Sequence, residues 1–195
     1  MARLFLLILA LSLAFQGLAS FRAIRPLGLG WQVYEDRVHG FRLYYPSDFV
    51  PLRASEPPMS LLAGAVVGFK LADEGYYRGT NLNGAAIIVS AQKVKGLKGC
   101  LQLDIAGMRS EYPQRIVVNG VIFYRQEFLE AGVGNLYRLI SYRTLHGEVC
   151  YIVALFIHWG NLKAFTPGTV VQFDEQAVLQ ELEGVFRTFQ FSGSS

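Results

Sequence analysis

The fold follows from one apolar run in the last third of the chain, Val149-Cys150-Tyr151-Ile152-Val153-Ala154-Leu155-Phe156-Ile157-His158. Successive side chains of a β-strand point to opposite sides of its sheet. Both alternating sets in this run are apolar, so the strand is expected in the middle of a sheet that is covered on both faces. The run 85–92 is also nearly all apolar, and it predicts a second strand of this kind.

Shorter strands and tight turns surround these two runs. Asn119-Gly120 separates two apolar segments, and this pair of residues adopts the positive φ angles of a type I′ hairpin turn. A second hairpin is predicted from strands 31–35 and 41–45, which flank a short polar turn. Further strands are expected at 64–71 and 136–145. The sheet is therefore expected to be antiparallel.

Two helices complete the predicted fold. In the segment 174–187, apolar residues recur at helical spacing, and Asp174 is placed to cap the first turn. The stripe consists of Val178, Leu182, Val185, Phe186 and Phe189. A second helix is predicted at 100–110, where Leu101, Ile105 and Met108 share one face. The expected fold class is α+β, an antiparallel twisted sheet sandwiched between helices.

The N-terminus has the pattern of a cleavable signal peptide. Arg3 precedes an apolar run from Leu4 to Phe15, and small residues follow it. Gly17 and Ala19 fit the cleavage rule, which places the cut after Ala19. A membrane anchor is the alternative, but a spanning helix needs about 20 apolar residues and the run is shorter.

The chain is accordingly expected to be secreted or periplasmic. Its predicted organisation is a signal peptide at 1–19, a flexible leader at 20–30, one domain at 31–191 and a flexible tail at 192–195. No stable membrane span is expected after cleavage. The net charge of +3 for the whole chain is too small to indicate a nucleic-acid partner, which calls for a clustered basic surface.

The chain has two cysteines, Cys100 and Cys150. In an exported protein, such a pair favours a disulfide, and its loop of about 50 residues would contribute on the order of 4 kcal/mol in the chain-entropy model. Two buried thiols or a partial metal site are the alternatives.

Two segments resemble the PsbP-like family, a superfamily that includes Ran-binding Mog-type proteins and small bacterial envelope proteins. The first is Gly40-Phe41-Arg42-Leu43-Tyr44-Tyr45-Pro46-Ser47-Asp48-Phe49, in which a turn glycine and an alternating strand lead to Tyr-Pro and then an acidic residue before an aromatic one. A Trp is more usual in the family at the position of Phe49. The second is the closing aromatic segment 185–191. The resemblance implies an α/β/α sandwich that binds a partner and has no catalytic residue set to carry over.

The residues themselves offer little for catalysis or for a cofactor. Gly-x-Ser-x-Gly, the usual nucleophile turn of serine hydrolases, is not present in the sequence. His146, Glu148 and Cys150 share one face of a strand, but their spacing of about 7 Å is too long for shared zinc ligation. No metal or other cofactor is therefore expected. His158 ends a core strand and is expected to pair with a carboxylate.

Four charged residues on neighbouring strands are expected to form a surface ion network, with a small anion site as the alternative. They are Arg125, Glu127, Arg138 and Arg143.

Two aromatic loops are the candidate binding residues. One contains Tyr76, Tyr77 and Arg78, and the other contains Trp159 and Phe165. Tyr, Trp and Arg are enriched at binding hot spots, and loops on a rigid sheet usually carry binding. The alternative is that these aromatic rings fold back onto the core.

The predicted function is therefore that of an exported, non-catalytic PsbP-like domain that binds an unidentified envelope protein. A carrier of a small apolar or amphipathic ligand is the first alternative. A hydrolase with an unrecognised site is the second.

Overall fold

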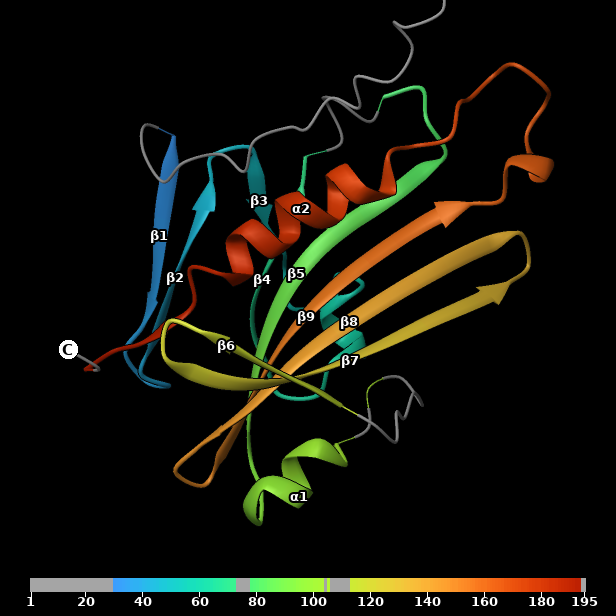
Figure 1. The fold of residues 1–195 in the computed structure, drawn as a ribbon. Coiled ribbons are helices and arrows are strands. Elements are labelled where there is room, and N and C mark those ends of the chain that lie inside the picture. The colour runs from blue at the N-terminus through green and yellow to red at the C-terminus, as the bar shows by residue number, and fades with distance from the viewer. Residues whose placement is uncertain (1–29, 73–77, 104, 106–112, 194–195) are drawn as a thin grey trace, which may run out of the picture.

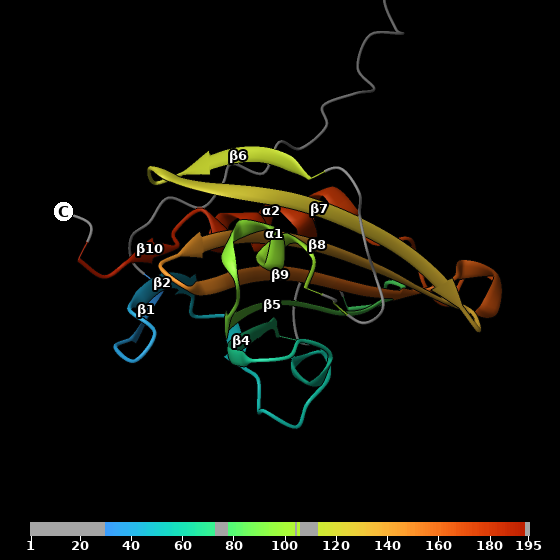
Figure 2. The same cartoon turned by 90° about the horizontal axis from the view of Figure 1, so that it is seen from below.

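The structure is a computed structural model that describes residues 30–72, 78–103, 105 and 113–193. Its main feature is a twisted, antiparallel, seven-stranded sheet in the order β3-β4-β5-β9-β8-β7-β6 (Figure 1). The strands are β3 (Phe49–Pro51), β4 (Ala65–Leu71), β5 (Leu82–Lys93), β6 (Gln114–Val118), β7 (Val121–Gly132), β8 (Asn135–His146) and β9 (Val149–Gly160). In a view turned by 90°, the strands from β6 to β4 follow one another as one curved layer (Figure 2).

The strand β9 lies in the middle of this sheet, as its apolar pattern predicts. It pairs with β5 on one side and with β8 on the other along its whole length. The residues Tyr151–Leu155 are all buried, because both sheet faces are covered there.

A second sheet of three strands lies beside the first. It has the order β1-β2-β10, with strands β1 (Trp31–Asp36), β2 (Phe41–Pro46) and β10 (Gln190–Phe191). The hairpin of β1 and β2 confirms the sequence prediction. The strand β10 was not predicted, because two residues are too few for a detectable alternation and only pairing with β2 defines them.

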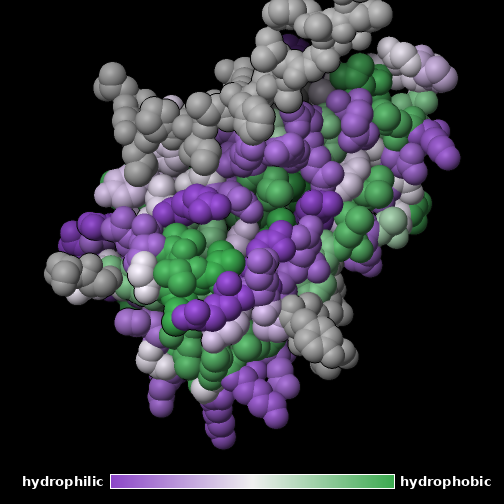
Figure 3. Space-filling model, viewed as in Figure 1, coloured by the Kyte–Doolittle hydropathy of each residue, from purple (hydrophilic) through white to green (hydrophobic). Residues whose placement is uncertain are grey.

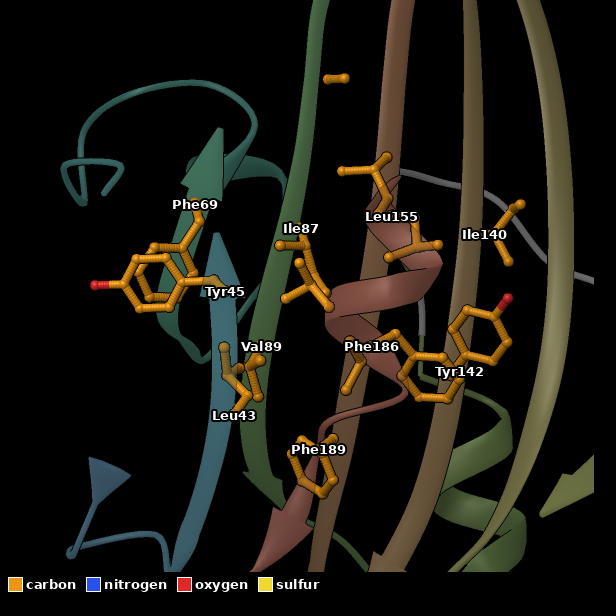
Figure 4. Close-up of a cluster of buried hydrophobic side chains, with 14 of the residues drawn as sticks. Leu43, Tyr45, Phe69, Ile87, Val89, Ile140, Tyr142, Leu155, Phe186 and Phe189 are labelled. Atoms are coloured by element: carbon orange, nitrogen blue, oxygen red, sulfur yellow. The ribbon is translucent and has the colours of Figure 1, made fainter. Parts of the chain in front are cut away.

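The helix α2 (Glu175–Phe186) covers one side of the large sheet, which we call the α2 face. Here Tyr142 stacks on Phe186, with ring centroids 3.8 Å apart (Figure 4). The ring of Phe123 meets that of Phe186 edge to face. The side chain of Asp174 accepts a hydrogen bond from the N–H of Ala177, which confirms the predicted cap.

The side chain of Asn119 caps the other end of α2. Its Nδ2 donates to the carbonyl oxygens of Arg187 and Phe189 at 2.8 and 2.9 Å. The residue also has a positive φ of 49°, as the predicted type I′ turn requires. One turn residue thus closes the hairpin of β6 and β7 and binds the chain that leaves α2.

On the opposite side, which we call the disulfide face, the described residues form little helix. This face is covered by α1 (Gly96–Leu101) and by the short 3-10 helix η1 (Met59–Leu61), whereas a second 3-10 turn, η2 (Leu162–Ala164), follows β9. The predicted sheet is thus confirmed, whereas the predicted sandwich between helices is not well supported on this side, because the described helices here are few and short. The predicted helix 100–110 is also displaced: the described helix begins at Gly96 and ends at Leu101, and most of 102–110 lies outside the described residues.

The predicted disulfide between Cys100 and Cys150 is present, and it joins α1 to β9. Beside it, Arg143 is 1% exposed, and its Nη1 donates to the carbonyl oxygens of Cys100, Leu101 and Leu103 at 3.2, 3.0 and 2.7 Å. A helix leaves its last carbonyl groups without partners inside the helix. The guanidinium of Arg143 satisfies these groups and so determines where α1 ends.

Candidate functional site

Three connections meet at one end of the large sheet. They are the residues 78–81 before β5, the turn 132–135 between β7 and β8, and the segment 160–173 after β9; we call them together the loop end (Figure 1). Thr80 and Val171 form an isolated parallel bridge, and the N–H of Asn161 donates to the carbonyl of Gly134 at 2.8 Å. The loop end is therefore tied together by main-chain hydrogen bonds.

The side chain of Asn81 holds this arrangement from inside. It is 1% exposed, its Nδ2 donates to the carbonyl of Gly160 at 2.7 Å, and its Oδ1 accepts from the N–H of Phe173 at 2.9 Å. A buried amide with satisfied partners orders the chain around it. Sequence reasoning missed Asn81, because one Asn in a polar loop gives no signal of where it points.

The aromatic residues of the second predicted loop fold back onto the protein. Trp159 is 8% exposed and packs against Phe173 with ring centroids 5.5 Å apart, so it belongs to the core of the α2 face. Phe165 is half-buried, and its ring packs directly on Gly160. A Cβ added to Gly160 would lie only 2.6 Å from the nearest atom of this ring. For this loop, the structure supports the alternative interpretation, in which the aromatic rings fold back onto the core.

The first predicted loop lies mostly outside the described residues. Tyr76 and Tyr77 are among those not described, whereas Arg78 is described and exposed. The grouping of Tyr76, Tyr77 and Arg78 with the second loop therefore stays a prediction. The basic groups of Arg78 and Lys163 are both exposed on connections of the loop end.

Apolar side chains, which the sequence did not single out, are exposed at the loop end. Val133 is fully exposed, with a relative accessibility of 102%, and Leu162 and Val171 are 40% and 63% exposed. Leu129 of β7 is exposed close to the same turn in sequence. In Figure 3, apolar surface lies between hydrophilic patches at the upper right, where these connections end.

Val133 also has an unfavourable backbone conformation. Its φ of 47° lies in the left-handed region, where a β-branched residue is a true outlier. The hairpin of β7 and β8 thus has a Val-Gly turn at a position where Asn-Gly or Asp-Gly is preferred. Such outliers cost on the order of 1–3 kcal/mol and cluster at functional sites.

The predicted ion network is present for three of its four members. Glu127 contacts both Arg125 and Arg138, and Arg138 contacts Glu175 of α2 at 2.9 Å. The side chains of Glu175 and of the three members in the network are partly exposed on the α2 face. Arg143 is the exception. It directly follows Tyr142 on β8, so its side chain points to the opposite side of the sheet, the disulfide face.

The three histidines have structural neighbours. His39 contacts Asp36 in its turn at 3.1 Å, and His146 stacks on Phe191. His158 lies beside two amides: its Nε2 is 2.9 Å from Asn135 Oδ1, and its ring stacks on Tyr137. The expected carboxylate partner of His158 is thus replaced by amides. Burial lowers the pKa of His158.

Metal binding finds no support in the described ranges. They contain no group of three His, Cys, Asp or Glu side chains that could hold a metal ion. Cys150 is in the disulfide, so it is not a free ligand beside His146 and Glu148.

One apolar pocket opens on the disulfide face. It encloses about 310 Å³, part of which is open solvent. Its lining is made by Pro58, Leu61, Leu62, Ile88, Ile105, Leu139, Ala154 and Phe156. The closed cavity expected of a carrier is not what this open pocket provides.

Comparison with known proteins identifies the fold. No family model and no curated protein matches the sequence. Among solved structures, the Saccharomyces cerevisiae Ran-binding protein Mog1p is 12% identical, with a TM-score of 0.51 over 83% of this chain and 95% of its own. A Mog1 E65A mutant is 13% identical, with a TM-score of 0.52 over 84% and 97%.

Two bacterial structures are also similar. A Bacteroides thetaiotaomicron protein has 12% identity and a TM-score of 0.51, and this chain spans about half of its length, 48%. PsbP from the cyanobacterium Synechocystis has 11% identity and a TM-score of 0.47 over 86% of this chain and 96% of its own. The chain has the PsbP/Mog-like fold that its sequence resembles, and at these identities the similarity concerns the fold.

Proposed function

We propose that the chain is an exported, non-catalytic domain that binds another protein of the cell envelope through its loop end. One observation carries the proposal. Val133 is fully exposed in a strained conformation, next in space to connections that also expose Leu162 and are held by buried Asn81. An exposed apolar side chain on a strained backbone does not stabilise the fold, whereas a bound partner could bury it.

The fold comparison supports binding only by analogy. The printed description of yeast Mog1p is that of a Ran-binding protein, so the fold serves protein binding in that case. Function resides in sites that differ between proteins of one fold. The residues of the loop end therefore carry the proposal, and the comparison adds to it.

Export is supported by the signal-like N-terminus and by the disulfide. Disulfides persist mainly in oxidising compartments, which include the bacterial periplasm. Within the described ranges, no helix combines the length and the apolar character needed to cross a bilayer.

Replacing Val133 by Asn separates binding from folding. Asn tolerates the left-handed region, so Val133→Asn should stabilise the domain by about 1 kcal/mol while it removes the exposed apolar group. Tagged protein 20–195 would be used to capture partners from its native envelope, and quantitative mass spectrometry would compare the variants. We expect Val133→Asn to recover less of a stoichiometric partner than the unchanged protein.

Val38→Asn is the matched control, because Val38 is 88% exposed in the turn between β1 and β2, outside the loop end. It should leave partner recovery unchanged. Equal recovery with Val133→Asn and with the unchanged protein would rule out the loop end as the binding surface.

A second candidate is a carrier of a small apolar molecule, which would lie against the apolar lining of the open pocket on the disulfide face. Leu61 is 45% exposed at the edge of this pocket, so Leu61→Lys would introduce a charge there with little effect on folding. Native mass spectrometry of protein from its own host would reveal a bound molecule that Leu61→Lys releases. Protein free of any bound molecule would remove this candidate.

A further inference from the structure

Among the described residues, the two sheets have four edge strands, and they differ in how they are protected. Exposed edges invite pairing with other chains, and short strands, proline and charge prevent it. β10 has two residues, β3 has three and ends in Pro51, and β1 ends in Glu35-Asp36. β6 has five residues, contains no proline, and carries one charged side chain, that of Arg115. It is the outermost strand of the curved layer that the large sheet forms (Figure 2).

The hairpin register determines which main-chain groups of β6 face outward. The two-residue turn makes Val118 and Val121 a hydrogen-bonded pair, and such pairs alternate along an antiparallel ladder. Ile116 is therefore bonded to Phe123 on β7. The N–H and C=O groups of Arg115 and Val117 point to the free edge instead.

The side chains near this edge are apolar on one surface. Val117 is 58% exposed, and its cross-strand neighbour Ile122 is 40% exposed. Arg115 is exposed on the same surface two residues away. This surface faces away from α2, because Ile116 and Val118 occupy the side that packs on the core.

We propose that two copies of this chain pair through β6, antiparallel and centred on Ile116. In this register, Arg115 of each copy lies opposite Val117 of the other, so all outward-pointing groups meet and form four main-chain hydrogen bonds. Ile116 lies opposite Ile116, and no like charges are directly opposed. A register centred on Val117 forms only two such bonds and sets Arg115 opposite the turn residue Asn119.

This self-complementarity selects a second copy as the occupant of the edge. A two-fold dimer requires one surface patch to match itself, and β6 does so in only one register. The dimer joins two seven-stranded sheets into one, at an edge that includes no residue of the loop end. The inference is therefore independent of the proposed function.

Introducing opposite charges at Val117 tests the register, because each should change the strength of association in a different direction. In Val117→Lys, each lysine would lie opposite Arg115 of the other copy, which should weaken association at least about tenfold. In Val117→Glu, each carboxylate would lie opposite Arg115, so association should be as strong as in the unchanged protein or stronger. Sedimentation velocity over a wide concentration range measures both constants.

Val33→Lys is the matched control, because Val33 is 56% exposed on the edge strand β1. It should leave the dissociation constant unchanged. A protein that sediments as a monomer at every concentration would overturn the proposal, and so would shifts in the same direction for Val117→Lys and Val117→Glu.

Cross-linking provides a second measurement. Two Ile116→Cys residues would face each other in a non-hydrogen-bonded pair with Cα atoms about 4.5 Å apart, within disulfide range. Two Val117→Cys residues would be displaced by about 6.6 Å along the strands and should not bridge. Mild oxidation should therefore yield a covalent dimer of Ile116→Cys alone, and equal yields for both variants would contradict the register.

Discussion

The two faces of the large sheet are held in different ways. On the α2 face, a helix of twelve residues buries Val178, Leu182, Val185 and Phe186 against aromatic rings of the strands. On the disulfide face, α1 has six residues and buries only Cys100. Both faces bury apolar side chains, but the cluster on the disulfide face is smaller. There the short helix α1 is attached by a covalent bond and by the hydrogen bonds of Arg143.

The difference follows from helix length. Most helical stability in proteins comes from packing of an amphipathic face, and a helix of less than two turns has too little of that face. A short helix must therefore be attached by other means. We expect the two faces to respond differently to the same kinds of change.

The largest effect is expected on the α2 face. Leu182 is fully buried, so Leu182→Ala should lower the free energy of unfolding by about 4 kcal/mol through lost transfer energy and a cavity. Gln176→Ala, at an exposed position of α2, should change it by less than about 0.5 kcal/mol. Urea unfolding measures both, and a loss of under about 1 kcal/mol for Leu182→Ala would contradict the role assigned to α2.

Removing the disulfide should have the next largest effect. It closes a separation of 50 residues. Replacing both Cys100 and Cys150 by Ala should cost about 3 kcal/mol, somewhat below the chain-entropy value of about 4, because a reduced chain retains some structure. Reductant should lower the unfolding midpoint of the unchanged protein and leave that of the double variant unaffected. A midpoint that reductant does not move would show that the disulfide face holds without its covalent bond.

A smaller and more local effect is expected for Arg143. Arg143→Met removes the donor to three carbonyl groups at the end of α1 and should cost about 2 kcal/mol. Hydrogen exchange should accelerate in α1 and stay slow in α2. Arg138→Met, on the same strand but on the α2 face and partly exposed, is the control and should leave exchange in α1 unchanged.

The smallest effect is a dependence on pH at the disulfide face. Burial lowers the pKa of His158, so the unfolded chain, with its ordinary value of 6.5, takes up the proton first as pH falls. The free energy of unfolding should therefore decrease as pH drops below about 6.5. His158→Gln should remove this contribution, which urea midpoints at pH 7.5 and at pH 5 would reveal. An unchanged pH profile in His158→Gln would assign the dependence to other groups.

Features that depend on neighbouring residues in the chain were readable from the sequence. Asn119-Gly120 predicts its turn because few residue pairs adopt two positive φ angles. The stripe of α2 and the two-sided apolar pattern of β9 follow from the periods of helix and strand. The lone pair of cysteines, in a chain with a signal-like N-terminus, favoured the disulfide that is present.

Features that depend on distant partners were not readable. Asn81, Arg143 and Trp159 carry the same signals as many residues with other roles, and burial alone decides that Trp159 belongs to the core. Val133 was missed because no local rule predicts a valine with a positive φ, and only the pairing of β7 with β8 imposes it.

The sequence by itself determined the longer strands, two hairpin turns and the closing helix of this protein, because side-chain period and turn chemistry act over a few residues. Only the tertiary structure decided where α1 ends, which residues the loop end exposes and which sheet edge stays open. These outcomes depend on contacts between residues far apart in the chain, such as Arg143 with Leu103 and Asn81 with Phe173, whose energies no local pattern encodes.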